Sequence, residues 1–158
     1  MDVPGGTPFI TVVVTATPTV SPTATATPIP ETAEVVLARL KGAGIPIGEY
    51  VVFDEETDPN KLLGRPNGYV GKINFLDTRI DRTRQDDFDT SDGGSIEVFT
   101  TPEAARARKD YIDALGKGSP FFVEYSYVNG KVLVRVSKEL TPSQAAEYEN
   151  AVNGLRGQ

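Results

Sequence analysis

Residues 121–137 read FFVEYSYVNGKVLVRVS, two runs of alternating apolar residues joined by Asn129-Gly130. An Asn-Gly pair between such runs is typical of a two-residue β-hairpin turn. With the turn at these two residues, Tyr127 lies opposite Val132, and one face of the hairpin is apolar along its length. We therefore expect this face to pack against the core.

The sequence on either side of the hairpin predicts helices and further strands. Thr-Pro pairs at 101–102 and 141–142 each precede an apolar stripe, which indicates two N-capped helices. Apolar spacing predicts another helix over residues 32–41. The predicted strands lie at residues 50–53, 70–76, 95–99, 121–128 and 131–137.

This order of elements predicts an α+β fold. We expect an antiparallel sheet of four to five strands with the helices packed on one face. The elements follow a ββα–ββα order after an N-terminal α–β lead.

Composition excludes several functional classes. The chain has 158 residues, a hydrophobic fraction of 39% and a net charge of −6. We expect no binding to nucleic acid or to anionic membranes, because both need a surface rich in Lys and Arg. Histidine and cysteine are absent, which removes the commonest general base, thiolate nucleophiles, disulfides and most transition-metal sites. We therefore expect a non-enzymatic monomer without a membrane span.

The first thirty residues differ in composition from the rest. Residues 7–30 read TPFITVVVTATPTVSPTATATPIP and carry no charge. Such runs stay extended and are typical of stalks on exported proteins. We predict a disordered linker over residues 1–30, a single α+β domain over residues 31–158, and an extracellular or cell-surface location. Neither a leader nor a lipid-bearing cysteine is present, so the mode of attachment stays open, as does the alternative of a cytoplasmic protein with an unusual tail.

Basic and aromatic residues in two loops are the candidate binding residues. The stretch 64–69 reads GRPNGY and lacks the strand and helix that flank a phosphate-binding loop. Arginine and tyrosine are common in binding hot spots. The candidates are Arg65, Asn67, Tyr69, Arg79 and Arg82.

An acidic loop resembles the first half of a calcium loop. Its alternating oxygen donors precede glycines, as in such a loop, but Asp92 stands where the turn glycine belongs and Val98 where the last glutamate belongs. A solvated turn explains the same residues. The candidate Ca²⁺ ligands are Asp87, Asp89, Ser91 and Asp92; no other cofactor is expected.

Three blocks of sequence carry a resemblance to a known group of proteins. They are DPNKLLGRPNGYVGKINFLDTRI (58–80), GGSIEVFTTPEAARARKDYI (93–112) and EYSYVNGKVLVRVSKELTPSQAAEYENAV (124–152). In this order they resemble uncharacterised secreted or lipoprotein-type domains of actinobacteria and related bacteria. The resemblance implies an extracytoplasmic domain that follows a low-complexity linker, and it implies no activity.

Three functions follow as expectations, of which the third is a structural spacer or inhibitor-like module that only a partner would identify. The first is a binding domain displayed on a flexible stalk at the cell envelope, whose partner is an envelope or extracellular protein or polymer. The alternative is a small hydrolase, or hydrolase accessory domain, that acts on cell-wall or extracellular polymers. Its catalysts would be two carboxylates at glycosidase separation, drawn from Asp54, Glu56, Asp77, Asp87 and Asp89.

Overall fold

A computed structural model describes residues 31–82 and 89–155 of the chain. The linker predicted for residues 1–30 lies outside these residues. Three helices, five strands and two short 3-10 turns follow one another in the described chain. In order they are α1 (Ala33–Gly42), β1 (Ile47–Val52), β2 (Gly71–Asp77), η1 (Thr90–Asp92), β3 (Gly93–Val98), α2 (Pro102–Gly118), η2 (Pro120–Phe122), β4 (Glu124–Asn129), β5 (Val132–Ser137) and α3 (Pro142–Asn153).

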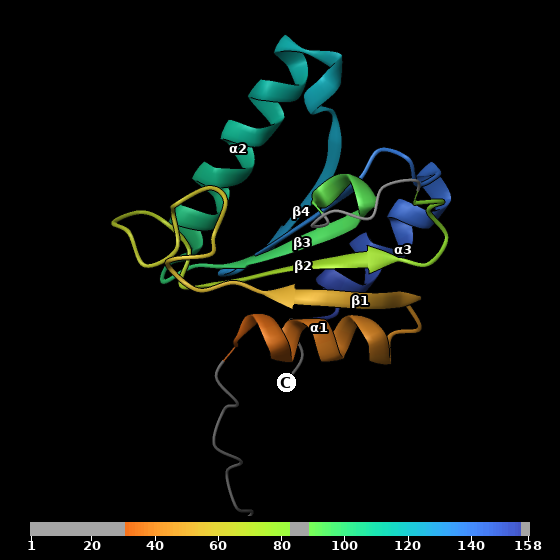
Figure 1. The fold of residues 1–158 in the computed structure, drawn as a ribbon, viewed down its shortest axis with the longest axis horizontal. Coiled ribbons are helices and arrows are strands. Elements are labelled where there is room, and N and C mark those ends of the chain that lie inside the picture. The colour runs from red at the N-terminus through yellow and green to blue at the C-terminus, as the bar shows by residue number, and fades with distance from the viewer. Residues whose placement is uncertain (1–30, 83–88, 156–158) are drawn as a thin grey trace, which may run out of the picture.

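The five strands form one antiparallel sheet in the order β1-β2-β3-β5-β4. The chain leaves β3 in the middle of the sheet, runs through α2 and re-enters at the edge strand β4 (Figure 1). The hairpin partner β5 then pairs with β3. This confirms the predicted α+β class and the ββα–ββα order after an α–β lead.

Local signals explain where the helices begin. The hydroxyl of Thr32 accepts a hydrogen bond from an N–H in the first turn of α1, and Thr101 does the same for α2. At α3, Thr141 and Gln144 form a reciprocal capping box, which satisfies two backbone N–H groups. The Thr-Pro pairs therefore mark helix starts, as the sequence predicts.

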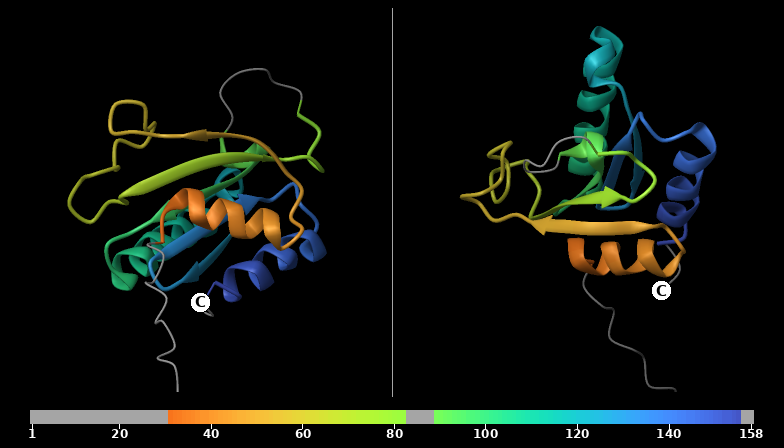
Figure 2. Two further views of the ribbon diagram at one scale, coloured as in Figure 1. Left: turned by 90° about the horizontal axis from the view of Figure 1, so that it is seen from below. Right: turned by 45° about the vertical axis from the view of Figure 1, so that its right-hand side comes forward.

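The main hydrophobic core lies between one face of the sheet and helices α1 and α3. The two helices cover the same face (Figure 2, left) and contribute residues to one buried cluster with the strands. The cluster contains residues at alternate positions of every central strand, among them Ile73, Phe75, Ile96, Val98 and Val134.

Helix α2 packs on the opposite face of the sheet, which differs from the expectation that all helices share one face. Ala105 joins a second buried cluster with Tyr69, Phe99 and Leu133. Leu133 alternates with the core residues of β5 and therefore points away from them. Only the N-terminal part of α2 belongs to this cluster, and the helix then rises steeply away from the sheet (Figure 1).

The hairpin register differs from the prediction by two residues. Asn129 pairs with Val132, so the turn consists of Gly130 and Lys131. Gly130 has a φ of 56°, which suits glycine at the first turn position.

The side chain of Asn129 explains the shift. Asn129 is buried, and its amide Nδ2 donates to the carbonyl oxygen of Val152 near the end of α3, at 2.7 Å. Asn129 thus ends a strand and satisfies a helix terminus instead of forming the turn. Tyr127 lies opposite Val134 rather than Val132, and because the shift is even, the apolar face still faces the core.

Candidate functional site

A cleft of about 350 Å³ lies on the sheet face that carries α2. This volume is at the lower end of the range for small-ligand sites. Three groups of side chains surround it: a floor of strand residues, a wall from the end of α2 and η2, and a second wall from the loops before β2 and β3. In that order they are Lys72, Asn74, Glu124, Arg135 and Ser137; Ile112, Leu115, Phe121, Phe122 and Val123; and Pro59, Asn60, Asp89, Thr90 and Ser91, with Lys138 at the rim.

A buried carboxylate on β3 lies beneath the floor and pairs with Arg135. Glu97 is fully buried, and its two oxygens accept hydrogen bonds from Arg108 Nε at 3.1 Å and Arg135 Nη1 at 3.0 Å. Arg108 comes from α2 and Arg135 from β5, so the pairing ties the helix to the sheet. A buried carboxylate is stable as an anion only when such partners compensate the loss of water.

Arg135 also pairs with Glu124 on the edge strand β4. Its Nη2 donates to Glu124 Oε2 at 2.9 Å, and its Nε donates to the other oxygen of the same carboxylate. Burial lowers the pKa of Arg135, but the hydrogen bonds and charges of Glu124 and Glu97 outweigh burial and raise it. The guanidinium in the floor is therefore a permanent, compensated charge.

Lys72 is the second cation in the floor. Its Nζ lies 3.4 Å from Asp58 Oδ1 and 3.3 Å from the Tyr69 hydroxyl, and it also lies 5.5 Å from the centroid of the Phe53 ring, a cation–π distance. Burial lowers the pKa of Lys72, while the charges of Glu97 and Asp58 oppose this effect.

Asp58 organises the loop before β2, which contributes Pro59 and Asn60 to the second wall. The carboxylate accepts hydrogen bonds from the backbone N–H of Leu62 at 2.8 Å and from the Tyr69 hydroxyl at 2.8 Å. The N–H groups of Leu63 and Asn60 donate to it as well. Burial raises the pKa of Asp58, but these hydrogen bonds outweigh burial and lower the pKa to about 2.

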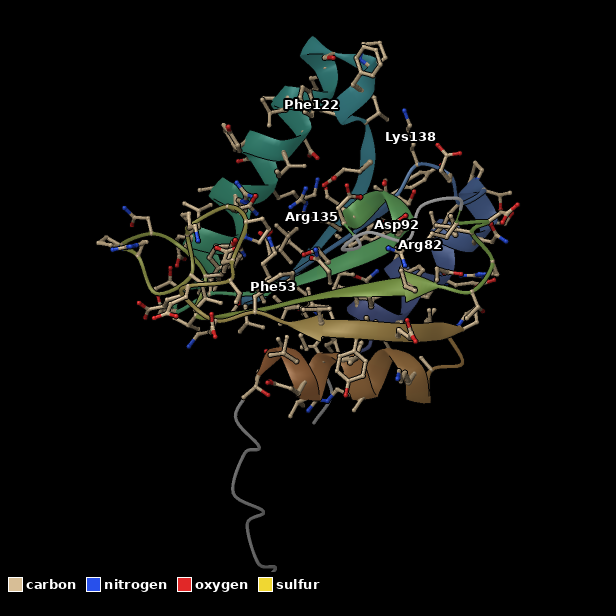
Figure 3. All side chains as sticks on the ribbon, in the orientation of Figure 1. Phe53, Arg82, Asp92, Phe122, Arg135 and Lys138 are labelled. Carbon is tan, nitrogen blue, oxygen red and sulfur yellow. The ribbon has the colours of Figure 1, made fainter. Side chains whose placement is uncertain are left out.

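The wall at the end of α2 is apolar and exposed. Phe121 and Phe122 are 87% and 57% exposed. They lie in the 3-10 turn η2, so β4 begins at Glu124 rather than at the predicted residue 121, because Ser119-Pro120 starts a capped turn. Figure 3 shows Phe122 near the outer end of the helix and Arg135 closer to the sheet. Two adjacent exposed phenylalanines are unusual on a soluble surface and favour a contact site.

The five predicted binding residues do not form one cluster. Arg65 and Asn67 are exposed in the loop before β2, whereas Tyr69 is fully buried with its hydroxyl on Asp58. Arg79 and Arg82 follow the other end of β2. A strand of this length separates the two groups by roughly 20 Å.

Arg79 and Arg82 interact with neighbouring carboxylates. Arg79 donates to Asp77 at 2.9 Å and to Glu147 on α3 at 2.6 Å. The Nε of Arg82 lies 3.7 Å from Asp92 (Figure 3). These pairs hold the segment after β2 against its neighbours.

The described part of the acidic loop forms the N-terminal cap of the 3-10 turn η1. Asp89 accepts hydrogen bonds from the N–H and hydroxyl of Ser91, and Asp92 accepts one from the backbone N–H of Asp89 at 3.0 Å. Asp87 lies outside the described residues. Within residues 31–82 and 89–155, no group of three or more acidic side chains is placed to hold a metal ion. Calcium binding stays a prediction.

The carboxylates expected for a hydrolase are dispersed. Asp54 and Glu56 are exposed in the loop after β1, and Asp77 is buried on the core face, where it accepts a hydrogen bond from Tyr148. Of the acids named for that function and described by the structure, Asp89 alone lines the cleft.

Sequence reasoning missed most of the cleft. Lys72, Glu97 and Arg135 each occupy the polar position of an alternating strand, which the pattern assigns to solvent. A charged residue in a central strand indicates a buried charge. Which strands are central depends on the strand order, which the sequence pattern does not give. Phe121 and Phe122 were predicted as strand residues.

The comparisons with known proteins add no assignment. No protein family, curated protein sequence or solved structure matches the chain. Among the described residues, no helix has the length and apolar character that a membrane crossing requires.

Proposed function

We propose that the chain is a non-enzymatic binding domain that acts outside the cytoplasm, and that the cleft between α2 and the sheet is its ligand site. The observation that carries the proposal is the contrast between the exposed Phe121-Phe122 wall and the charged floor of the cleft. Concave sites with an apolar wall and a few placed polar groups are the usual form of ligand sites.

The state of the carboxylates supports binding rather than catalysis. Glu97 and Glu124 are held by arginines, and Asp89 accepts hydrogen bonds from Ser91. A general acid or base must be free to exchange a proton with the substrate. Glu97 and Glu124 are instead occupied by hydrogen bonds from guanidinium groups, which suits a fixed recognition surface.

The location rests on composition. The Thr/Pro-rich segment 7–30 is of the type that carries exported domains away from a surface. We propose attachment to the cell envelope through this segment, with an envelope or extracellular polymer or protein as the ligand.

The test uses the full chain and three envelope fractions: lipid vesicles, delipidated protein and purified polysaccharide. Co-sedimentation of the wild-type chain is expected with the protein or the polysaccharide fraction and not with the vesicles. The double variant Phe121→Ser/Phe122→Ser should lose this binding. The matched control is Tyr111→Ser, which removes an exposed aromatic ring on α2 that does not line the cleft. Binding to no fraction, or equal binding by the double variant, contradicts the proposal.

A further inference from the structure

We propose that the ligand of the cleft is a neutral saccharide chain, whose hydroxyl groups contact the floor and whose ring C–H face packs on Phe121 and Phe122. This inference rests on the proposed function, because it takes the cleft to be the binding site, and it adds the chemical class of the ligand.

The charges at the cleft nearly cancel, which argues against an ionic ligand. Lys72, Arg135 and Lys138 contribute three positive charges to the lining, and Asp89 and Glu124 contribute two negative charges. Buried Glu97 beneath the floor supplies one more negative charge. An anion would approach Glu124 and Asp89, and a cation would approach Arg135 and Lys72, so each would meet repulsion along with attraction.

The polar groups of the lining present both donors and acceptors at short spacing. The amides of Asn60 and Asn74 each donate and accept, as do the hydroxyls of Thr90 and Ser137. A sugar hydroxyl also donates and accepts, so it can use adjacent groups of both kinds. A purely apolar ligand would cover these donors and acceptors and make no hydrogen bond to them, which is unfavourable.

A buried hydroxyl beneath the floor also supports a ligand that carries hydroxyl groups. Ser95 on β3 lies in register between Asn74 and Arg135, which both line the cleft, so all three side chains share one sheet face. Ser95 is fully buried, and its Oγ has no hydrogen-bond partner among the described residues. A buried hydroxyl without a partner is uncommon and favours a missing hydroxyl or water neighbour.

The polar groups of the floor come from side chains and not from free backbone, which favours a saccharide over a peptide. Peptides are most often read through backbone hydrogen bonds at a free strand edge. Of the three strands that line the floor, β2 and β5 are interior to the sheet, so their backbone groups pair with neighbouring strands, and β4 is an edge strand that contributes Glu124 alone. Recognition in the cleft therefore comes from amide, carboxylate, guanidinium and hydroxyl side chains, which can each contact a sugar hydroxyl.

The apolar wall supplies a surface for the C–H face of a sugar ring. A sugar ring has a face of C–H groups that is apolar, and an aromatic ring covers it at little entropic cost because few side-chain torsions must be ordered. Phe121 and Phe122 are adjacent, exposed and next to the polar floor. Together they match a ligand that is apolar on one face and polar at its edges.

The test is a calorimetric titration of the full chain with short oligosaccharides. The neutral probes are oligomers of N-acetylglucosamine, glucose, mannose and galactose. The charged counterparts are oligomers of glucosamine, which are cationic, and of galacturonic acid, which are anionic. At least one neutral probe should bind, and more tightly than either charged probe. Phe121→Ser/Phe122→Ser should weaken it by about tenfold or more, whereas Tyr111→Ser should leave it unchanged.

Other outcomes separate this inference from the proposed function. If the neutral probes do not bind but the delipidated protein fraction sediments with the chain in a Phe121- and Phe122-dependent manner, the saccharide class is wrong and the binding cleft stands. Tighter binding of a charged probe also overturns the saccharide class as stated. Saccharide binding that the double variant retains places the ligand elsewhere and overturns both.

Discussion

An Asp58→Asn substitution tests how electrostatics support the loop wall of the cleft. The carboxylate accepts hydrogen bonds from the N–H groups of Leu62 and Leu63 and from the Tyr69 hydroxyl, and it lies 3.4 Å from Lys72 Nζ. Asparagine keeps the shape and one acceptor oxygen, but it places an NH₂ group where the second oxygen accepts. We expect a less stable domain with a loosened loop before β2.

The magnitude follows from the pKa and from the partner that is left behind. The pKa of Asp58 falls from 3.8 to about 2, and at 1.36 kcal/mol per pH unit this corresponds to about 2 kcal/mol of stability. The variant also leaves the buried ammonium group of Lys72 without this opposing charge. We therefore expect a loss of about 2–4 kcal/mol in the free energy of unfolding at pH 7.

The pH dependence has a definite sign. Because the pKa of Asp58 is lower in the folded state, the folded carboxylate contributes its full stability above about pH 4. This contribution is lost as the pH falls through the folded pKa near 2. The stability difference between wild type and Asp58→Asn should therefore shrink by about 2 kcal/mol between pH 5 and pH 2.

The assay is urea unfolding followed by far-UV circular dichroism, repeated from pH 7 down to about pH 2. The matched control is Glu56→Gln, an exposed carboxylate in the same loop. Its effect should stay within about 0.5 kcal/mol at every pH. A difference between wild type and Asp58→Asn that is constant across this range would refute the reasoning, as would an equal loss in the control.

Two further substitutions test strand β3, which lies between the cleft and the main core. Glu97→Gln leaves Arg108 and Arg135 without their shared buried anion, so unfolding titrations should show a loss of about 3–5 kcal/mol; a loss below about 1 kcal/mol would mean that water already compensates both guanidinium groups. Gly94→Ala places a Cβ 2.4 Å from the ring of Phe75 and 2.5 Å from the carbonyl oxygen of Arg135, and thermal unfolding should show a destabilisation of about 1–3 kcal/mol. Gly118→Ala meets no atom within 4 Å and is the matched control, which should be neutral or slightly stabilising. An unchanged melting temperature for Gly94→Ala would show that the sheet relaxes around the added methyl group.

The hairpin illustrates how far a local signal reaches. The apolar alternation in 121–137 correctly predicts two paired strands and the face that they bury. The turn itself lies one residue later, at Gly130-Lys131, because Asn129 is occupied by the terminus of α3. That contact joins residues far apart in the chain, so no local pattern contains it.

The candidate site shows the same limit more strongly. Arg65 and Tyr69 are close in sequence, yet one is exposed and the other is buried against Asp58. Glu97 and Arg135 look like solvent-facing strand residues, and they become a buried pair only because α2 crosses that face of the sheet.

The sequence by itself determined the α+β class, the order of the elements and the starts of the helices, because apolar periodicity and Thr-Pro caps act within a few residues of chain. It also determined which chemistry is absent, since a chain without histidine or cysteine lacks imidazole and thiolate groups. The tertiary structure alone decided that α2 lies opposite α1 and α3, and that charged strand residues form the floor of a cleft. The physical reason is that burial and charge pairing depend on the strand order β1-β2-β3-β5-β4, which brings distant segments together.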